Sequence, residues 1–237
     1  MSTFQNEFAQ PIGAPLANWK GAKPPSRVTL DGRYCRLVPV DPAAHLNDLA
    51  EAYDSAADGR DWTYLATGPF STLEAYQEHL EKLASSTDPL HFTVIDTASG
   101  KAFGTLALMR IDAVNGVIEV GFIAFSPLLK KTRIATEAIF LLMRHVFDDL
   151  GYRRFEWKCD SLNEPSRAAA KRFGFTFEGI FRQATTYKGR SRDTAWFSII
   201  DPEWPALKTR YERWLDPKNF DADGAQIERL STPQSAK

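Results

Sequence analysis

The chain of 237 residues is poor in cysteine, has no surplus of charge of either sign and lacks any long apolar segment. Its two cysteines, Cys35 and Cys159, are too few for a disulfide framework, and its four histidines are not spaced with them as metal ligands. Lysine and arginine number 29 against 30 aspartates and glutamates, a net charge of -1. Binding to nucleic-acid phosphates requires a cationic surplus. We therefore expect neither a bound metal nor a nucleic-acid partner.

The lack of a long apolar run also bears on where the protein works. No apolar stretch approaches the ~20 residues that a membrane-spanning helix requires. Residues 1–20 lack the basic and apolar regions of a signal peptide. We therefore expect a cytoplasmic protein with no membrane partner. The residues that are present, 43% hydrophobic and 25% charged, are typical of a folded domain.

The order of apolar patterns along the chain predicts one mixed α/β domain with additions at both ends. Residues 1–27 contain four prolines and are expected to form an extended arm anchored by Trp19. Strand and helix patterns alternate over residues 28–200, which form the domain. Residues 201–237 are expected to form a helix and a polar tail. The aromatic residues of that helix either cover the core or form a dimer interface, so a monomer and a homodimer both remain open.

A cluster of cations stands between a predicted strand over 116–125 and a predicted helix over 135–150. Lys130, Lys131 and Arg133 fall within four positions of one another. A helix N-terminus favours phosphate because its first amides are unpaired and carry partial positive charge. The segment therefore indicates a phosphate site, although a solvated basic loop would have the same composition.

A second motif follows at the start of the next predicted helix. Asn163 stands at the junction of loop and helix and precedes the pair Gly174-Phe175 by eleven residues. With the basic segment, this spacing resembles the GNAT N-acyltransferase superfamily, in particular its RimJ/RimL-like branch of ribosomal-protein N-terminal acetyltransferases. The resemblance covers residues 28–200. It implies the GNAT acyl-CoA N-acyltransferase fold of class α/β (α+β), a mixed central sheet of about seven strands flanked by about four helices.

The resemblance also implies acetyl-CoA as the acyl donor. In the family, a Gln/Arg-x-x-Gly-x-Gly/Ala pattern binds the pyrophosphate through its amides, and Lys130, Arg133 and Ala135 stand at the matching positions. Asn163 would bind the pantetheine arm, and strand amides would stabilise the developing oxyanion of the acetyl carbonyl. The donor-binding residues expected on this basis are Phe122, Ile123, Ala124, Lys130, Lys131, Thr132, Arg133, Ile134, Ala135, Thr136 and Asn163.

Two positions depart from the family pattern. Arg133 replaces the usual first glycine, so it either adds charge for the phosphates or distorts the loop. Ala170 stands where many members carry a tyrosine that protonates the leaving thiolate. In the resembled branch a serine three residues after the asparagine takes this role, and that residue is Ser166 here. The alternative is that Ser166 and Asn163 serve only to start the helix.

The expected general base is Glu119, which interrupts an otherwise apolar strand over 117–123. Burying a carboxylate there is costly and would raise its pKa towards that of a useful base. A surface glutamate on an edge strand is the alternative. Glu156 alternates with Lys158 on the next predicted strand, which favours a surface or structural role for Glu156.

Two aromatic residues, Trp62 and Tyr64, lie in the loop between the first two predicted helices. By the same resemblance this loop forms one wall of the acceptor pocket, where these rings would bind the acceptor. The alternative is that they fill the core, which is the more common role of aromatic side chains.

These observations predict an acetyl-CoA-dependent N-acetyltransferase in which a primary amine attacks the thioester directly within a ternary complex. Glu119 would accept the amine proton and Ser166 would assist the departure of CoA, without a metal. The resembled branch suggests a protein N-terminal α-amine as acceptor. Three alternatives stay open: a small-molecule acetyltransferase acting on a polyamine, amino acid or antibiotic, a succinyl-type acyltransferase, and a non-catalytic acyl-CoA-binding module.

Overall fold

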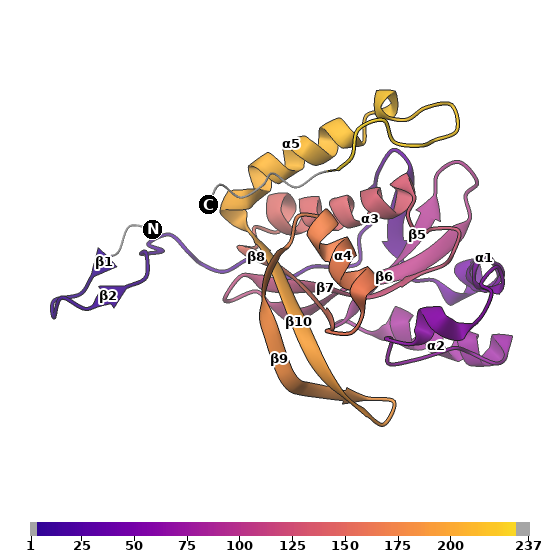
Figure 1. Cartoon of the computed structure of the whole chain (residues 1–237), viewed down its shortest axis with the longest axis horizontal. Coiled ribbons are helices and arrows are strands. Elements are labelled where there is room, and N and C mark those ends of the chain that lie inside the picture. Colours follow the sequence, from indigo (N-terminus) through magenta and orange to yellow (C-terminus); the bar gives the residue numbers. More distant parts are fainter. Residues whose placement is uncertain (1–3, 231–237) are drawn as a thin grey trace.

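The centre of the protein is an eight-stranded sheet in the order β3-β4-β5-β6-β7-β8-β10-β9 (Figure 1). The computed structural model describes residues 4–230. The strands of this sheet are β3 (Leu30–Asp31), β4 (Cys35–Pro39), β5 (Leu90–Asp96), β6 (Ala102–Asp112), β7 (Val117–Phe125), β8 (Arg154–Asp160), β9 (Thr176–Tyr187) and β10 (Arg190–Ile200). Neighbouring strands run antiparallel except β7 and β8, which are parallel. The predicted mixed sheet and α/β class are confirmed.

Five α-helices cover the two faces of the sheet. They are α1 (Pro42–Asp54), α2 (Leu73–Ser85), α3 (Arg133–Arg144), α4 (Glu164–Arg172) and α5 (Trp204–Trp214). Four of them begin at a short polar side chain that accepts a hydrogen bond from a first-turn amide, namely Asp41, Thr72, Thr132 and Asn163. Helices α1 and α2 pack on one face around their own apolar cluster, whereas α3, α4 and α5 pack on the other. No helix within residues 4–230 is both long and apolar enough to cross a membrane.

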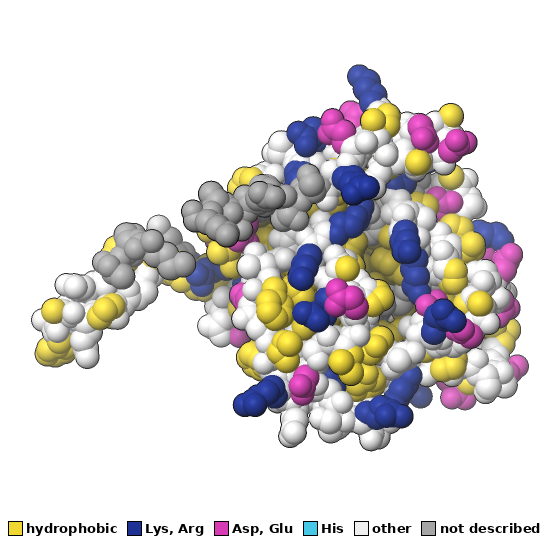
Figure 2. All heavy atoms as spheres, in the orientation of Figure 1, with side chains coloured by type: hydrophobic (Ala, Val, Ile, Leu, Met, Phe, Trp, Pro, Cys, Tyr) yellow, Lys and Arg dark blue, Asp and Glu magenta, His cyan; other side chains and the backbone are white. Residues whose placement is uncertain are grey.

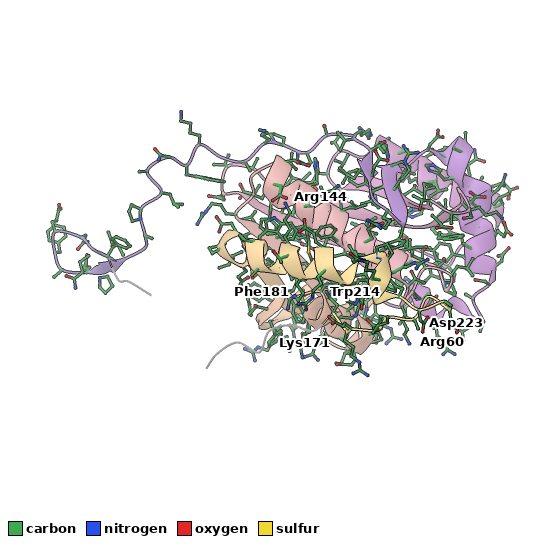
Figure 3. The ribbon with its side chains drawn as sticks, turned by 90° about the horizontal axis from the view of Figure 1, so that it is seen from above. Arg60, Arg144, Lys171, Phe181, Trp214 and Asp223 are labelled. Atoms are coloured by element: carbon green, nitrogen blue, oxygen red, sulfur yellow. The ribbon has the colours of Figure 1, made fainter. Side chains whose placement is uncertain are left out.

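Helix α5 covers the outer side of α3. The ring of Phe140 on α3 stacks on Tyr211 with 5.3 Å between centroids, and Phe147, just after α3, stacks on Trp204 at 5.3 Å. Figure 3 shows α5 lying along α3, with Trp214 at the end of α5. Because α3 has the sheet on one side and α5 on the other, residues 135–143 are all buried. The aromatic C-terminal helix therefore covers the core, which is one of the two roles that its sequence left open.

Strands β7 and β8 separate after a short pairing. Val117–Val120 pair with Arg154–Trp157, and beyond these four pairs the two strands have no register. On its other side β7 bulges: its register with β6 shifts between Thr105 and Ala107, and Phe122 has a φ of +47°. A bulge bends its strand and increases the local twist. The second half of β7 therefore leaves β8, and an opening forms in the middle of the sheet.

Strands β9 and β10 form a long hairpin that the sequence predicted only in part. Apolar strand patterns occur in the sequence over 175–180 and 193–200, and the hairpin continues between them through 181–192, which is mostly polar and charged. Lys188 and Gly189 form its turn with φ values of +48° and +70°. The Nζ of Lys188 donates to the carbonyl oxygens of Trp62 (2.7 Å) and Gly68 (2.9 Å). The hairpin tip is thereby tied to the loop between α1 and α2.

The N-terminal arm is held by Trp19. Its Nε1 donates to the carbonyl oxygen of Val114 at 2.8 Å, and the guanidinium of Arg153 lies 5.5 Å from the ring centroid. Beyond it, β1 (Phe4–Gln5) and β2 (Pro11–Ile12) pair as a separate two-stranded sheet that projects away from the domain (Figure 1).

Candidate active site

A cleft of about 900 Å³ opens where β7 and β8 separate. It is lined by these two strands, the loop before α3, the start of α4, the hairpin β9–β10 and the loop between α1 and α2. Figure 2 shows this face of the molecule hollowed near its centre, with lysine and arginine side chains around the hollow. Both predicted catalytic residues, Glu119 and Ser166, line the cleft.

Glu119 and Ser166 reach the cleft from opposite faces of the sheet. On β7, Ile118 and Val120 belong to the core beneath α3, so alternation directs Glu119 to the other face. Ser166 lies in the first turn of α4, where its Oγ accepts a hydrogen bond from Nε1 of Trp157 at 3.0 Å. That indole also packs in the core on the α3 side. The opening between β7 and β8 therefore connects a carboxylate on one face with a hydroxyl on the other.

Glu119 is only 4% exposed and lies on a central strand, which excludes the alternative of a surface glutamate on an edge strand. Its Oε2 is 2.9 Å from Nζ of Lys158 and 3.2 Å from Nε of Arg110. Burial raises the pKa of Glu119, the charges of Lys158 and Arg110 partly offset that rise, and Glu156 adds to it. Because the net direction is upward, this carboxylate is a stronger base than an exposed glutamate.

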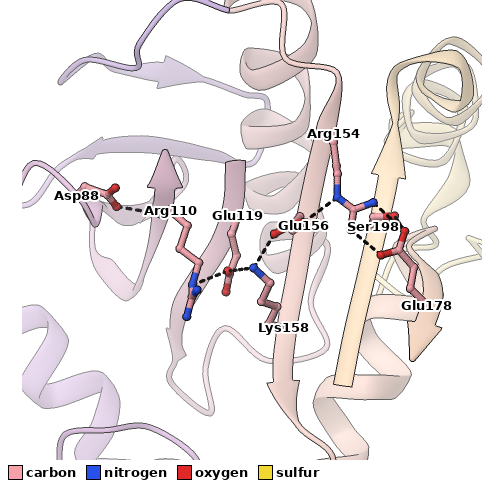
Figure 4. A network of polar contacts seen from close by, with 8 residues as sticks. All are labelled: Asp88, Arg110, Glu119, Arg154, Glu156, Lys158, Glu178 and Ser198. Carbon is pink, nitrogen blue, oxygen red and sulfur yellow. Dashed lines mark hydrogen bonds and ion pairs between the residues drawn. The ribbon is translucent and has the colours of Figure 1, made fainter. Parts of the chain in front are cut away.

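Glu119 stands in a row of alternating charges that crosses the sheet (Figure 4). Lys158 also pairs with Glu156 at 2.6 Å, and Arg154 pairs with Glu156 at 2.7 Å and with Glu178 at 2.5 Å. The side chains of Lys158 and Glu156 are 6% and 7% exposed, so of the two roles expected for Glu156 the structure supports the structural one. Buried charges that satisfy one another are held in one geometry. The row therefore fixes where Glu119 points.

The hydroxyl of Ser166 can donate its proton to a ligand. An indole N–H only donates, so Trp157 occupies a lone pair of the Ser166 oxygen, and the O–H can donate to a sulfur atom, either that of Cys159 or that of a ligand. The thiol of Cys159 lies close by: burial raises the pKa of Cys159, and a hydrogen bond with Ser166 partly offsets the rise. A thiol of raised pKa is a poor nucleophile. The O–H of Ser166 is thus able to donate to a sulfur atom at this place. The raised pKa of Cys159 argues against a role for its thiol as a covalent catalyst.

Asn163 both starts α4 and lines the cleft. Its Oδ1 accepts a hydrogen bond from the amide of Ser166 at 3.2 Å. Its Nδ2 makes no hydrogen bond within residues 4–230 and remains a donor for a ligand. The helix-start role and the ligand-binding role proposed for this residue are therefore compatible.

The bulge on β7 leaves two residues beside the cleft without a paired residue on either neighbouring strand. Phe122 and Ile123 line the cleft and have no partner residue in the registers with β6 or β8. Ala124, predicted with them, is instead paired with Thr105 and does not line the cleft. Amides released from a ladder in this way are suited to bind a carbonyl oxygen that becomes negative.

Some of the donor-binding residues predicted in and just after the basic segment line the cleft. Lys130, Lys131 and Ala135 line it. Lys130 also forms an ion pair with Asp61, which joins this segment to the loop between α1 and α2. Oγ1 of Thr132 accepts from the amide of Ala135 at 3.1 Å, and the two earlier first-turn amides, those of Arg133 and Ile134, have no acceptor within the helix. This end of the cleft therefore offers cations and free amides, as a pyrophosphate requires.

The side chain of Arg133 lies outside the cleft lining. Its guanidinium lies 4.5 Å from the ring centroid of Tyr34 and 5.3 Å from that of Phe220. This placement corrects the expectation that its charge acts directly on the phosphates, because two aromatic rings hold it elsewhere. Three further side chains predicted with it also lie outside the cleft lining, namely Thr132, Ile134 and Thr136.

The two aromatic residues predicted for the acceptor wall have different positions. Trp62 is 8% exposed and packs between Tyr53 and Phe70, with centroid distances of 5.0 Å and 5.3 Å. It therefore belongs to the apolar cluster of α1 and α2, which corrects its expected contact with the acceptor. Tyr64 does line the cleft, and its hydroxyl donates to the carbonyl oxygen of Leu162 at 3.1 Å.

Sequence reasoning gave no site role to the cations that line the cleft on the Glu119 face of the sheet. Arg110, Lys158 and Arg192 come from three different strands and meet only in the folded sheet. The sequence held one signal for Lys158. It alternates with Glu156 on a strand whose other positions are apolar, and charges on such a strand are costly to bury unless they are paired. Within residues 4–230, no group of three or more His, Cys, Asp or Glu side chains is placed to hold a metal ion.

Known proteins share this architecture. The family model described as "Acetyltransferase (GNAT) domain" matches residues 35–176. The chain is 52% identical to a GCN5-related N-acetyltransferase from Brucella melitensis whose crystal structure superposes with a TM-score of 0.88, covering 91% of this chain and 97% of that one. For a GNAT-family protein from Chromobacterium violaceum the identity is 40% and the TM-score 0.76, over 83% and 98% of the two chains. YdaF of Bacillus subtilis, to which a ribosomal N-acetyltransferase function is ascribed, is 30% identical over 109 residues, 46% of this chain and 59% of that protein.

Proposed function

The chain belongs to the GNAT acetyltransferase family, and on that premise we propose that it transfers the acetyl group of acetyl-CoA to the α-amine of a peptide or protein N-terminus. The observation that carries this proposal is the placement of Glu119 and Ser166 on opposite faces of the sheet, at one opening. Donor and acceptor can therefore meet in the opening from opposite faces, as direct transfer in a ternary complex requires.

The proposed chemistry needs one proton acceptor and one proton donor. The neutral amine attacks the carbonyl carbon, the new C–N bond forms and the C–S bond breaks. Glu119 takes the proton that the amine loses, directly or through water, and the Ser166 hydroxyl donates to the departing sulfur. The backbone amides of Phe122 and Ile123, which lie at the bulge and beside the cleft, would hold the carbonyl oxygen while it carries negative charge.

For the donor, we assign the other end of the cleft. The amides at the start of α3 and the ammonium of Lys131 would hold the pyrophosphate, and Nδ2 of Asn163 would donate to the pantetheine arm. The unpaired amides, the small side chain of Ala135 and the surrounding cations fit such a group.

An α-amine acceptor suits the moderate base that Glu119 provides. The pKa of an α-amine is about 8 and that of a lysine side chain about 10.4, so at neutral pH the neutral fraction of the α-amine is a few hundred times larger. The ribosomal N-acetyltransferase function ascribed to YdaF supports the same acceptor class and the RimJ/RimL-like branch.

The test is release of CoA, read with a thiol reagent, from acetyl-CoA and a panel of amines. We expect turnover with peptides that have a free N-terminus and none with the same peptides blocked there but carrying an internal lysine. Turnover with polyamines alone would indicate a small-molecule enzyme. Binding of acetyl-CoA without turnover on any amine would indicate an acyl-CoA-binding module, and faster turnover with succinyl-CoA would change the donor.

A further inference from the structure

The cations that line the cleft differ in whether they are paired. Four of the six form an ion pair with a carboxylate, namely Arg60, Arg110, Lys130 and Lys158. The side chains of the other two, Lys131 and Arg192, form no hydrogen bond or ion pair within residues 4–230. Lys131 lies beside α3, where the donor's phosphates are expected. Arg192 lies on the hairpin β9–β10, and donor binding gives it no role.

Arg192 lies on the same face of the sheet as Glu119. The register of β10 with β9 shifts between Arg192 and Thr194, but Arg192, Thr194 and Trp196 all line the cleft and so share one face. Trp196 stands opposite Lys158 in the register, and Nζ of Lys158 lies 3.8 Å from its ring centroid. Since Lys158 also pairs with Glu119, this face of β10 is the acceptor side of the cleft.

Two buried donors on this face have no acceptor. Nε of Arg192 and Nε1 of Trp196 are both buried and make no hydrogen bond within residues 4–230, and both residues line the cleft. Neither side chain can accept a hydrogen bond, so each can be satisfied only by a lone pair, most simply an oxygen atom. Buried polar groups in folded proteins are nearly always paired. These donors therefore indicate oxygen atoms on the acceptor.

The neighbouring carboxylates do not satisfy Arg192. Asp160 accepts from the amide of Leu162 at 2.9 Å and from the hydroxyl of Tyr187 at 2.8 Å. Asp193 accepts from the amide of Gln183 at 2.7 Å. Because both carboxylates are engaged by other donors and neither forms an ion pair with Arg192, the guanidinium remains available to an anion from outside the chain.

We propose that the acceptor carries a carboxylate that Arg192 binds while its amine lies at Glu119, with Trp196 donating to an oxygen atom between them. The inference rests on the proposed acyl transfer and specifies its acceptor. The Cα atoms of Arg192 and Trp196 are ~13 Å apart along the strand, whereas one extended residue spans about 3.5 Å. That separation favours an acidic side chain near a peptide N-terminus over the α-carboxylate of a free amino acid.

Two pairs of acceptors test the proposal, each pair differing only in a carboxylate. The first pair is a peptide that begins Ala-Glu and the same peptide beginning Ala-Gln. The second pair is free alanine and ethylamine, which lacks the carboxylate. We expect wild-type kcat/KM to be about 10- to 100-fold higher for the Ala-Glu peptide, because a bidentate Arg–carboxylate pair is charge-assisted.

Variants at two arginines of the same strand show whether Arg192 causes this preference. Arg192→Ala should bring the ratio of the two peptides close to one, and Arg192→Glu should favour a peptide beginning Ala-Lys, a gain that a misfolded protein cannot give. Arg190→Ala is the matched control, since Arg190 is exposed and outside the cleft, and it should keep the wild-type ratio.

The outcomes separate this inference from the proposed function. Peptide turnover with no preference for the carboxylate, or a preference unchanged in both Arg192 variants, overturns the inference and leaves the peptide acceptor standing. Turnover of alanine, with none of ethylamine or of either peptide, keeps the carboxylate site and overturns the peptide acceptor. Turnover of ethylamine at the rate of alanine, with no peptide turnover, overturns both.

Discussion

Replacing Glu119 with glutamine removes the proposed base and keeps its size. In the native protein Nζ of Lys158 lies 2.9 Å from Oε2 of Glu119. In Glu119→Gln the amide oxygen can still face this ammonium, but it cannot take a proton. Lys158 keeps its ion pair with Glu156 at 2.6 Å, so the substitution does not leave this buried ammonium without a partner. We therefore expect the fold to persist and kcat to fall.

The size and pH dependence of the effect follow from the environment of Glu119. General base catalysis contributes about 10²- to 10⁴-fold, and an α-amine of pKa about 8 is roughly one-tenth neutral at pH 7 without help. We therefore expect kcat to fall about 100-fold. Because only ionised Glu119 accepts a proton, the wild-type rate rises with pH through the raised pKa of this group. That acidic limb should be absent in Glu119→Gln.

Glu156→Gln provides the matched control, because Glu156 belongs to the same row of charges and does not line the cleft. Its charge raises the pKa of Glu119, so its removal should move the acidic limb to lower pH and keep most of kcat. The assay is CoA release across about pH 5 to 9, with acceptors of different amine pKa to separate the enzyme's limb from the amine's. A Glu119→Gln enzyme with wild-type kcat and an unchanged limb would refute the base assignment.

Four further substitutions test the role of Ser166 at the sulfur, the binding of the phosphates and the stability of the turn between β3 and β4. Ser166→Ala should lower kcat about 10- to 100-fold with little change in the KM for acetyl-CoA; an unchanged kcat would remove its role at the sulfur. Lys131→Gln should raise that KM about 3- to 10-fold, whereas Arg133→Gln should change it less and lower the melting temperature, because the Arg133 guanidinium lies over two aromatic rings. Equal effects on KM would contradict this distinction. Glu137→Gln should cost about 3 kcal/mol in urea unfolding, because this buried carboxylate accepts three amides of the turn at 2.6–2.8 Å; a cost below about 1 kcal/mol would mean that the turn holds without its charge.

The parts of the site that sequence could predict are those defined by local pattern. The motif from Asn163 to Ser166 is one turn of helix, and its geometry follows from its own residues. Glu119 could be predicted as a candidate base because a carboxylate within an apolar strand is costly to bury. Strand and helix periodicity were enough for the mixed sheet, since alternation and the 3.6-residue stripe are properties of each segment alone.

The parts that sequence could not predict depend on partners distant in the chain. Arg133 was expected at the phosphates, but Tyr34 and Phe220, roughly 90 or more residues away on either side, hold its guanidinium. Trp62 was expected at the acceptor and is instead enclosed by α1 and α2. The hairpin through 181–192 was missed because its polar residues show no apolar alternation, and side-chain hydrogen bonds to distant residues, from Lys188 to Trp62 and from Tyr187 to Asp160, tie it to the domain.

The link between Lys188 and the loop of Trp62 and Gly68 bears on how such an enzyme could change its substrate during evolution. Within residues 4–230, the ammonium of Lys188 donates only to main-chain carbonyl oxygens of that loop, which are present whatever side chains the loop carries. The side chains that line the cleft between the two anchoring carbonyls, Thr63 to Ala66, can therefore be exchanged without breaking the link. New acceptors could be accommodated by mutating that short stretch while the opening between β7 and β8, where the chemistry is proposed, stays as it is.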